Sequence, residues 1–267
     1  MSTLQMMPAE YSVEGKTVIV TGAARGIGKG IARVLAESGA SVMVTALTDR
    51  YLKPLAQELA AAGHPIEALT ADGTDADDWR RTVDTALERW GHIDVLVNNL
   101  GDAIRKPLVP APGSGGEPIT DEEWRFVLDV NLTQAFMGCR AVGPHFLERS
   151  KGRVINISGV AARKGNPEAL VYSAAKAGLV QLTQTLALEW APYGVTVNSI
   201  APGLFPDPET SDATQVALSR DSARDSVPLG RVGELREVGL LALYLASDAS
   251  AYMTGETIYL DGGLSQR

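Results

Sequence analysis

The chain has 267 residues, of which 45% are hydrophobic and 21% are charged, a balance typical of one large globular α/β domain. Its formal net charge of −8 argues against a surface that binds nucleic acid. A single cysteine, Cys139, excludes an intrachain disulfide, and three scattered histidines lack the spacing of metal ligands. No apolar run is long enough for a membrane span. We therefore expect a cytoplasmic protein without a metal site.

Short apolar runs alternate along the chain with segments of helical periodicity such as Gly28–Ser38 and Ala175–Trp190. Residues 1–13 are expected to be a flexible leader, and residues 14–267 one domain. Its alternation predicts a doubly wound, Rossmann-type α/β/α sandwich around a seven-stranded, mainly parallel sheet. The predicted strands are Thr17–Thr21, Ser41–Thr45, Ile66–Thr70, Ile93–Val97, Arg153–Ile157, Val195–Ile200 and Thr257–Leu260.

Two segments rich in proline and glycine interrupt this alternation, Pro107–Pro118 and Pro202–Asp212. Both follow predicted strand ends, on the side where a doubly wound sheet binds its ligands. They are either plain surface loops or flaps over a substrate. We expect residues 107–118 and 202–226 to lie on the substrate side.

The stretch "VIVTGAARGIGKGIA" places Gly22, Gly26 and Gly28 between the first strand and its helix. Glycines there permit a tight turn, close approach of a pyrophosphate and close helix packing, while the N–H groups of the helix N-terminus bind phosphate. This context predicts a dinucleotide-binding loop, which also contains Ala24, Arg25 and Ile27.

The end of the second strand indicates which cofactor binds. An acidic residue there would bind the 2′-hydroxyl of NAD and repel the 2′-phosphate of NADP. The position holds Ala46, followed by Leu47, and Arg25 is available for a phosphate. NADP(H) is therefore favoured over NAD(H). In the alternative, Asp49 turns inward to the ribose.

Further cofactor contacts are expected where other strands end. Asn99 and Gly101, in "VLVNNLG", follow the fourth strand, and an asparagine amide there can shape the cofactor floor. Asp72, with Gly73, follows the third strand and is placed to meet an adenine amino group.

Tyr172 and Lys176 lie four residues apart in "YSAAK", so they share one face of a helix. A phenol has a pKa of about 10 and is a poor acid or base at neutral pH. A nearby ammonium favours phenolate and lowers that pKa toward the useful range. Because this helix begins after the fifth strand, the pair is expected beside the nicotinamide.

The segments "TGAARGIG", "NNLG", "DVNL", "YSAAK", "NSIAPG" and "PLGRVG" occur in an order and spacing that resemble the short-chain dehydrogenase/reductase family. The resemblance covers nearly all of residues 14–263. Among the members of the family, the chain resembles 3-oxoacyl-ACP reductases and gluconate 5-dehydrogenases. It implies a nicotinamide cofactor, Pro202 and Gly203 near that cofactor, and a homotetramer or homodimer. It implies further that Tyr172 is the general acid/base, Lys176 its pKa modifier and ribose ligand, and Asn131 the residue that holds a water of the proton relay.

The catalytic serine departs from the family pattern. That serine usually stands 13 residues before the tyrosine, where this chain has Gly159, while Ser158 is 14 residues before it. Either the loop shifts so that Ser158 reaches the substrate carbonyl, or the hydroxyl is absent. We include Ser158 among the expected catalytic residues.

These observations predict an NAD(P)-dependent oxidoreductase that transfers hydride between a nicotinamide and a carbonyl/alcohol pair. Two basic pairs, Arg105–Lys106 and Arg163–Lys164, are expected at the substrate mouth and suggest an anionic substrate, such as a keto acid, a sugar acid or a 3-oxoacyl thioester. In the alternative, both pairs point into solvent or cross a subunit interface. The alternatives are a dinucleotide-binding regulatory or scaffold protein with impaired catalysis, which Gly159 would favour, and a sugar-nucleotide epimerase, which would need a larger C-terminal substrate domain.

Overall fold

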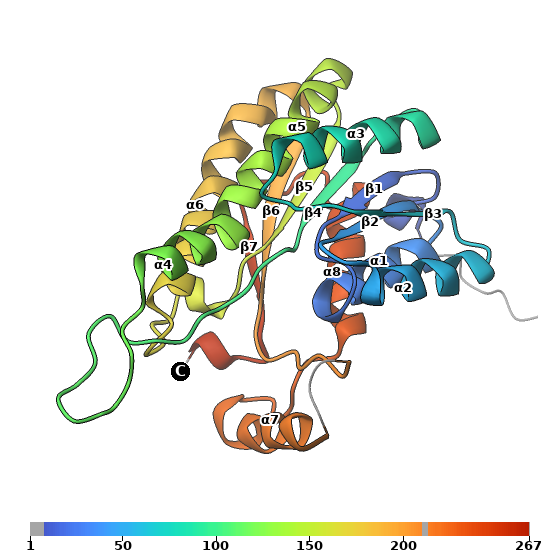
Figure 1. Cartoon of the computed structure of the whole chain (residues 1–267). Coiled ribbons are helices and arrows are strands. Elements are labelled where there is room, and N and C mark those ends of the chain that lie inside the picture. The colour runs from blue at the N-terminus through green and yellow to red at the C-terminus, as the bar shows by residue number, and fades with distance from the viewer. Residues whose placement is uncertain (1–7, 210–212, 267) are drawn as a thin grey trace, which may run out of the picture.

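One parallel sheet runs through the described residues, 8–209 and 213–266 of this computed structural model (Figure 1). Its strand order is β3-β2-β1-β4-β5-β6-β7, with every pairing parallel. The predicted doubly wound, seven-stranded sheet is confirmed, with strand ends within two residues of those expected. The strands are β1 Thr17–Val20, β2 Ser41–Ala46, β3 Ile66–Thr70, β4 Val95–Asn98, β5 Gly152–Ile157, β6 Val195–Pro202 and β7 Thr257–Leu260.

Helices cover both faces of this sheet (Figure 1). On one face lie α1, α2 and α8, and on the other lie α3, α5 and α6. The chain reverses its direction of progress across the sheet between β1 and β4, so a ligand crevice is expected at their carboxyl ends. The helices are α1 Gly26–Glu37, α2 Asp49–Ala61, α3 Ala76–Trp90, α4 Asp121–Leu128, α5 Gln134–Arg149, α6 Leu170–Trp190, α7 Ala213–Ser226 and α8 Leu235–Ala246.

Successive side chains of a strand pack into two separate hydrophobic cores, one on each face of the sheet. Val18 and Val20 of β1 pack on the side that includes Ile31 of α1, whereas Ile19 packs on the side that includes Phe146 of α5. All five are fully buried. Because successive strand side chains point to opposite faces, a continuous apolar run is what a sheet covered on both faces requires.

Residues 8–12 of the expected leader are exposed, whereas Val13 at its end is packed into the core. Val13 is fully buried in the core under α1 and α8, and the Tyr11 ring lies 6.1 Å from the ring of Tyr244 on α8. The apolar side chains of Val13 and Tyr11 pack against residues far along the chain, and the local sequence does not predict these contacts. Residues 1–7 lie outside the described part of the chain.

The two expected substrate-side segments behave differently. Residues 107–118, between β4 and α4, project away from the body of the molecule and are largely exposed (Figure 1). Helix α7, within residues 202–226, lies beyond the carboxyl edge of the sheet, and residues 210–212 are outside the described chain. A flap role for either segment stays a prediction. In the described parts of the chain, no helix combines the length and apolarity that crossing a membrane requires.

Candidate active site

The glycine loop between β1 and α1 is closely packed. A Cβ atom at Gly28 would lie 2.4 Å from Asn99 Nδ2, and one at Gly22 would lie 3.0 Å from the Leu100 backbone. Gly26, the first residue of α1, has a left-handed φ of +54°. Side chains are therefore excluded where a pyrophosphate would approach the helix N-terminus, so the loop fits a dinucleotide. Of the other expected loop residues, Ala24 and Ile27 are partly buried against the core under α1.

Acidic residues after β6 lie against this loop. Asp207 forms an ion pair with Arg25 at 3.4 Å, and Glu209 pairs with Lys29 on α1. A Cβ atom at Gly26 would lie 3.6 Å from the Asp207 carboxylate. A carboxylate thus stands beside the expected phosphate site, a feature that the sequence analysis missed because Asp207 and Arg25 are 182 residues apart.

At the expected ribose end, β2 ends at Ala46, which is half-buried, and Leu47 is exposed. The Asp49 carboxylate accepts a hydrogen bond from Thr70 Oγ1 at 2.6 Å and pairs with Lys53 at 2.5 Å. These contacts, with Lys53 the stronger, hold the pKa of Asp49 below its usual value. Asp49 is thus held by a residue of β3 and by a residue of its own helix, α2.

The Asn99 side chain forms part of the loop's support. Its Nδ2 donates to the carbonyl oxygens of Thr21 and Gly22, both at 3.0 Å. These bonds tie the end of β4 to the end of β1, and a role of Asn99 in the cofactor floor stays a prediction.

The remaining expected cofactor residues also lie where strands end. After β3, Asp72 Oδ1 accepts hydrogen bonds from the backbone and hydroxyl of Thr74, and a Cβ atom at Gly73 would lie 2.9 Å from the Leu100 side chain. Pro202 is the last residue of β6, and the N–H of Gly203 donates to the carbonyl of Leu260 in β7 at 3.0 Å.

Tyr172 and Lys176 share the first turns of α6. Lys176 is 3% exposed, and its Nζ donates to the carbonyl oxygen of Ile157 at 2.9 Å. The same nitrogen lies 5.5 Å from the centre of the Tyr172 ring. The end of β5 therefore fixes the ammonium beside the phenol.

Burial shifts the pKa of both members of this pair. It raises the pKa of Tyr172, against a lowering by the charge of Arg105 and a further raising by Asp102. Burial also lowers the pKa of Lys176 to about 8. That Lys176 lowers the pKa of the phenol stays a prediction; in this structure its ammonium is buried and donates to the carbonyl oxygen of Ile157. The strongest lowering influence comes from Arg105, which the sequence analysis placed only at the substrate mouth.

Asn131 lies in a π-helical segment, Asp129–Thr133, between α4 and α5. Its Nδ2 donates to the carbonyl oxygens of Val127 at 2.8 Å and Asp102 at 2.6 Å. Its Oδ1 is buried without a hydrogen-bond partner. A Cβ atom at Gly101 would lie 2.6 Å from this oxygen and 3.1 Å from Lys176 Nζ. An unused acceptor and an ammonium donor thus flank one small space, a suitable place for a bridging water.

Ser158 and Gly159 have different surroundings. Ser158 Oγ is hydrogen-bonded to Ser199 Oγ at 2.7 Å and to the carbonyl of Ile200 at 3.2 Å, both on β6. A Cβ atom at Gly159 would instead lie 3.5 Å from the hydroxyl of Tyr172. Because the Ser158 hydroxyl is bound within the sheet while Gly159 faces the tyrosine, the geometry favours the alternative in which the catalytic hydroxyl is absent.

Known proteins with the same sequence pattern decide the family. Residues 22–265 match the family described as Enoyl-(Acyl carrier protein) reductase. The chain belongs to the short-chain dehydrogenase/reductase family. Homologous members are named reductases and dehydrogenases, so this chain is an NAD(P)-dependent oxidoreductase that acts on carbonyl and alcohol groups.

Individual relatives of this short-chain dehydrogenase/reductase have several different substrates. It is 36% identical to 3-oxoacyl-[acyl-carrier-protein] reductase FabG of Thermotoga maritima over 252 residues, which is 94% of this chain and 98% of that protein. It is 35% identical to 3beta-hydroxysteroid dehydrogenase 1 of Eggerthella lenta over 255 residues, 95% of each chain. A gluconate 5-dehydrogenase from Burkholderia cenocepacia, solved with NADP and tartrate, matches with a TM-score of 0.87 at 31% identity, covering 97% of this chain and 98% of that one.

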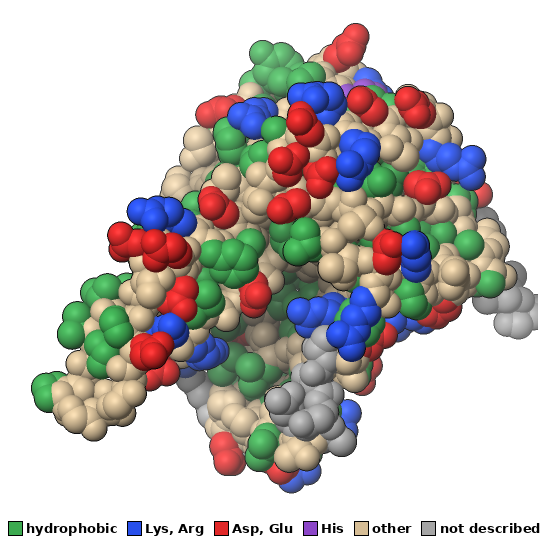
Figure 2. Space-filling model, in the orientation of Figure 1, with side chains coloured by type: hydrophobic (Ala, Val, Ile, Leu, Met, Phe, Trp, Pro, Cys, Tyr) green, Lys and Arg blue, Asp and Glu red, His purple; other side chains and the backbone are tan. Residues whose placement is uncertain are grey.

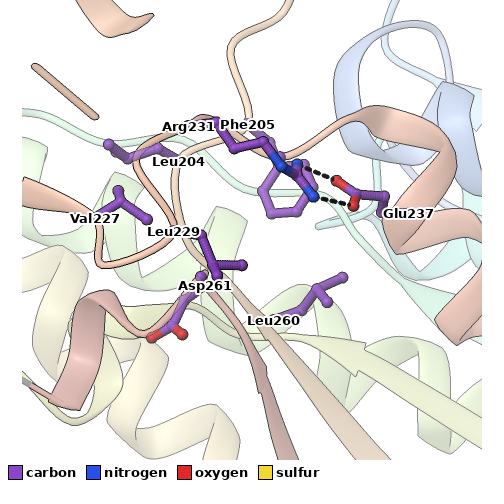
Figure 3. A pocket seen from close by; sticks show the side chains of 10 residues that line it. Leu204, Phe205, Val227, Leu229, Arg231, Glu237, Leu260 and Asp261 are labelled. Atoms are coloured by element: carbon purple, nitrogen blue, oxygen red, sulfur yellow. Dashed lines mark hydrogen bonds and ion pairs between the residues drawn. The ribbon is translucent and has the colours of Figure 1, made fainter. Parts of the chain in front are cut away.

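The segment after β6 in this short-chain dehydrogenase/reductase is anchored beside a small pocket (Figure 3). Arg231 donates to both carboxylate oxygens of Glu237, at 2.9 and 2.7 Å, and holds the Glu237 pKa at about 2. Phe205 packs so closely that a Cβ atom at Gly233 would lie 2.3 Å from its ring. This anchor fixes both ends of the region that carries Asp207 and α7, and Figure 2 shows the hollow above that region.

Proposed function

We propose that this enzyme interconverts a carbonyl and a secondary alcohol with Tyr172 as the proton donor and acceptor. The bound nicotinamide cofactor supplies or accepts the hydride. In reduction the Tyr172 hydroxyl donates its proton to the substrate oxygen, and in oxidation the phenolate takes it back. The observation that carries this proposal is the unpaired buried Oδ1 of Asn131, which faces the same space as Lys176 Nζ beside Gly101.

The charges of the site suit this role at neutral pH. A Tyr172 pKa raised by burial keeps the phenol protonated, as reduction requires. A Lys176 pKa of about 8 leaves the ammonium mostly protonated but able to exchange its proton with a neighbouring water. Asn131 Oδ1 would accept a hydrogen bond from that water and hold it in place.

We further propose a preference for NADP(H). Ala46 presents no carboxylate to a 2′-phosphate, and Asp49 is engaged by Thr70 and Lys53. Arg25 is the residue directly before α1, and its half-exposed side chain, paired with Asp207, could turn to a phosphate. Titration of the protein with NADPH and NADH, followed by cofactor fluorescence, should show NADPH binding at least several-fold more tightly. Tighter binding of NADH would refute the preference.

An anionic substrate, such as a keto acid, a sugar acid or a 3-oxoacyl thioester, is proposed from the cations near the site. Lys106 is paired with Glu123 at 2.7 Å, and Lys164 donates to a backbone carbonyl. Arg163 instead stacks on the Tyr259 ring at 5.4 Å, and Arg105 forms no ion pair with any described acid. The two arginines are therefore the available anion ligands.

The direct experiment is a panel of matched neutral and anionic ketones and alcohols, with turnover read from the absorbance of the reduced cofactor. We expect turnover with both classes and a lower KM for the anionic members. Equal KM values for the matched pairs would contradict the anionic substrate class, whereas no turnover with any carbonyl or alcohol would contradict the proposed reaction itself.

We also propose a homotetramer or a homodimer. The support comes from large exposed side chains on α4, α5 and α6, where Phe126, Phe136 and Leu188 are 46%, 48% and 78% exposed. A cytoplasmic location is proposed because Cys139 is a free buried thiol, which a reducing compartment preserves. Light scattering after gel filtration tests the assembly, and a monomer at micromolar concentration would refute it.

A further inference from the structure

A hydroxyl group is missing beside the tyrosine of this enzyme. The place of the usual family serine is taken by Gly159, whose Cβ position lies 3.5 Å from the Tyr172 hydroxyl. Ser158 offers no replacement, because its hydroxyl is committed to Ser199 and Ile200. A developing negative charge on the substrate oxygen therefore needs another donor, since one such donor contributes about 10²–10³ in rate.

The loop after β4 carries the exposed side chain of Arg105 and is tied to the body of the molecule at two points close to Tyr172. The carbonyl of Asp102 accepts a hydrogen bond from Asn131 Nδ2 at 2.6 Å. The N–H of Lys106 donates to the carbonyl of Glu168 at 2.9 Å, just before α6 begins. Arg105 lies between these two tethers, which attach its loop to Asn131 on one side and to the start of the Tyr172 helix on the other.

Arg105 is also the cation of this loop whose charge is available. The neighbouring Lys106 is neutralised by Glu123 at 2.7 Å and by Glu117 at 3.6 Å. Arg105 has no such acid among the residues that the structure describes. Burial raises the pKa of Tyr172, and the positive charge of Arg105 opposes this rise, as expected for a cation near the phenol.

We propose that the guanidinium of Arg105 takes the place of the missing serine hydroxyl and donates a hydrogen bond to the substrate oxygen beside Tyr172. This inference rests on the proposed carbonyl/alcohol reaction. In reduction, hydride adds to the carbonyl carbon, the C=O π electrons move to oxygen, and that oxygen takes the Tyr172 proton. Arg105 stays protonated throughout, because a guanidinium cannot be deprotonated at working pH, and so it stabilises charge without transferring a proton.

The test uses a neutral ketone, so that binding of a substrate charge plays no part. Arg105→Ala should lower kcat by about 10²–10³-fold, as removal of an oxyanion donor does. The matched control is Lys106→Ala, the adjacent cation, which should change kcat less than about threefold because its charge is already compensated. The double variant Arg105→Ala/Gly159→Ser should have a kcat at least about tenfold higher than Arg105→Ala alone. Gly159→Ser in the wild-type background should change kcat by less than about threefold.

A second readout needs neither cofactor nor turnover. Tyrosine ionisation in the cofactor-free protein is followed by ultraviolet absorbance as pH rises, and the signal lost in Tyr172→Phe identifies Tyr172 among the seven tyrosines. Arg105→Ala should show a higher Tyr172 pKa than the wild type. The proposal is overturned if Arg105→Ala leaves kcat for the neutral ketone intact and raises KM only for anions. It is also overturned if Gly159→Ser fails to rescue or if the Tyr172 titration does not move. Turnover that survives Tyr172→Phe would instead refute the underlying reaction.

Discussion

The hydroxyl oxygens of Ser158 and Ser199 lie 2.7 Å apart between the end of β5 and β6. Both side chains are almost completely buried, and Ser158 Oγ also contacts the carbonyl of Ile200. A buried hydroxyl with these partners stabilises the join between two central strands. It is not available to a substrate carbonyl.

Ser158→Ala should therefore change stability more than catalysis. We expect kcat to stay within about threefold of wild type, and the free energy of unfolding to fall by about 1–3 kcal/mol, because Ser199 loses its buried partner. Urea unfolding and steady-state kinetics measure the two effects. A kcat reduced more than tenfold at unchanged stability would show that Ser158 acts on the substrate after all.

Asp207→Asn should strengthen cofactor binding. The Asp207 carboxylate stands 3.6 Å from the Cβ position of Gly26 and pairs with Arg25, so it would oppose the negative charge of a pyrophosphate and compete with it for Arg25. Removing that charge should lower the Kd for NADPH roughly three- to tenfold, with a smaller effect at high salt. The control is Glu58→Gln. Glu58 lies on α2 and pairs with Arg33, which is farther along α1 from the glycine loop, so this variant should leave Kd unchanged. Weaker binding by Asp207→Asn would instead mark Asp207 as part of the cofactor site.

Lys176→Met should stabilise the folded protein while it abolishes turnover. The folded pKa of Lys176, about 8, lies below the value of 10.5 for an unperturbed lysine, so the unfolded chain binds more protons between these pH values. Wild-type stability should rise as pH increases from 8 to 10.5, and Lys176→Met should lack that rise. At pH 7 the variant should be more stable by on the order of 1–3 kcal/mol, after loss of the bond to Ile157 is included. Parallel stability–pH curves for the two proteins would contradict a desolvated lysine.

Arg163→Ala should raise KM for anionic substrates while matched neutral substrates are unaffected. Its guanidinium lies over the Tyr259 ring, beside the expected substrate mouth, and a cation there attracts a carboxylate or phosphate. The effect should shrink as salt increases. Arg140, which stacks on Phe136 in α5 at 5.0 Å, supplies a control of the same type, Arg140→Ala. An equal rise in KM for neutral and charged substrates would exclude charge recognition by Arg163.

Patterns that are local in sequence predicted most of the fold. Strand positions followed from apolar runs, because both faces of a parallel sheet are buried. The glycine loop and the Tyr172–Lys176 pair followed from spacing along one turn or one helix. The burial of Val13 was not predicted because it depends on α8, more than 200 residues away.

The missed features of the site are contacts between distant segments. The pairing of Asp207 with Arg25 depends on how the segment after β6 returns to α1. The raised pKa of Tyr172 depends on burial, which no spacing reveals. The π-helical geometry around Asn131 leaves no mark in "DVNL" that differs from an ordinary helix.

Single-turnover kinetics of Tyr172→Phe tests the central claim most directly. Phenylalanine keeps the ring beside Lys176 and deletes only the hydroxyl that transfers the proton. We predict that the variant loses nearly all hydride transfer to or from the substrate, while NADPH binds with a Kd within about threefold of wild type. A variant that retained most of the wild-type rate would contradict proton transfer by Tyr172, and with it the proposed reaction at this site.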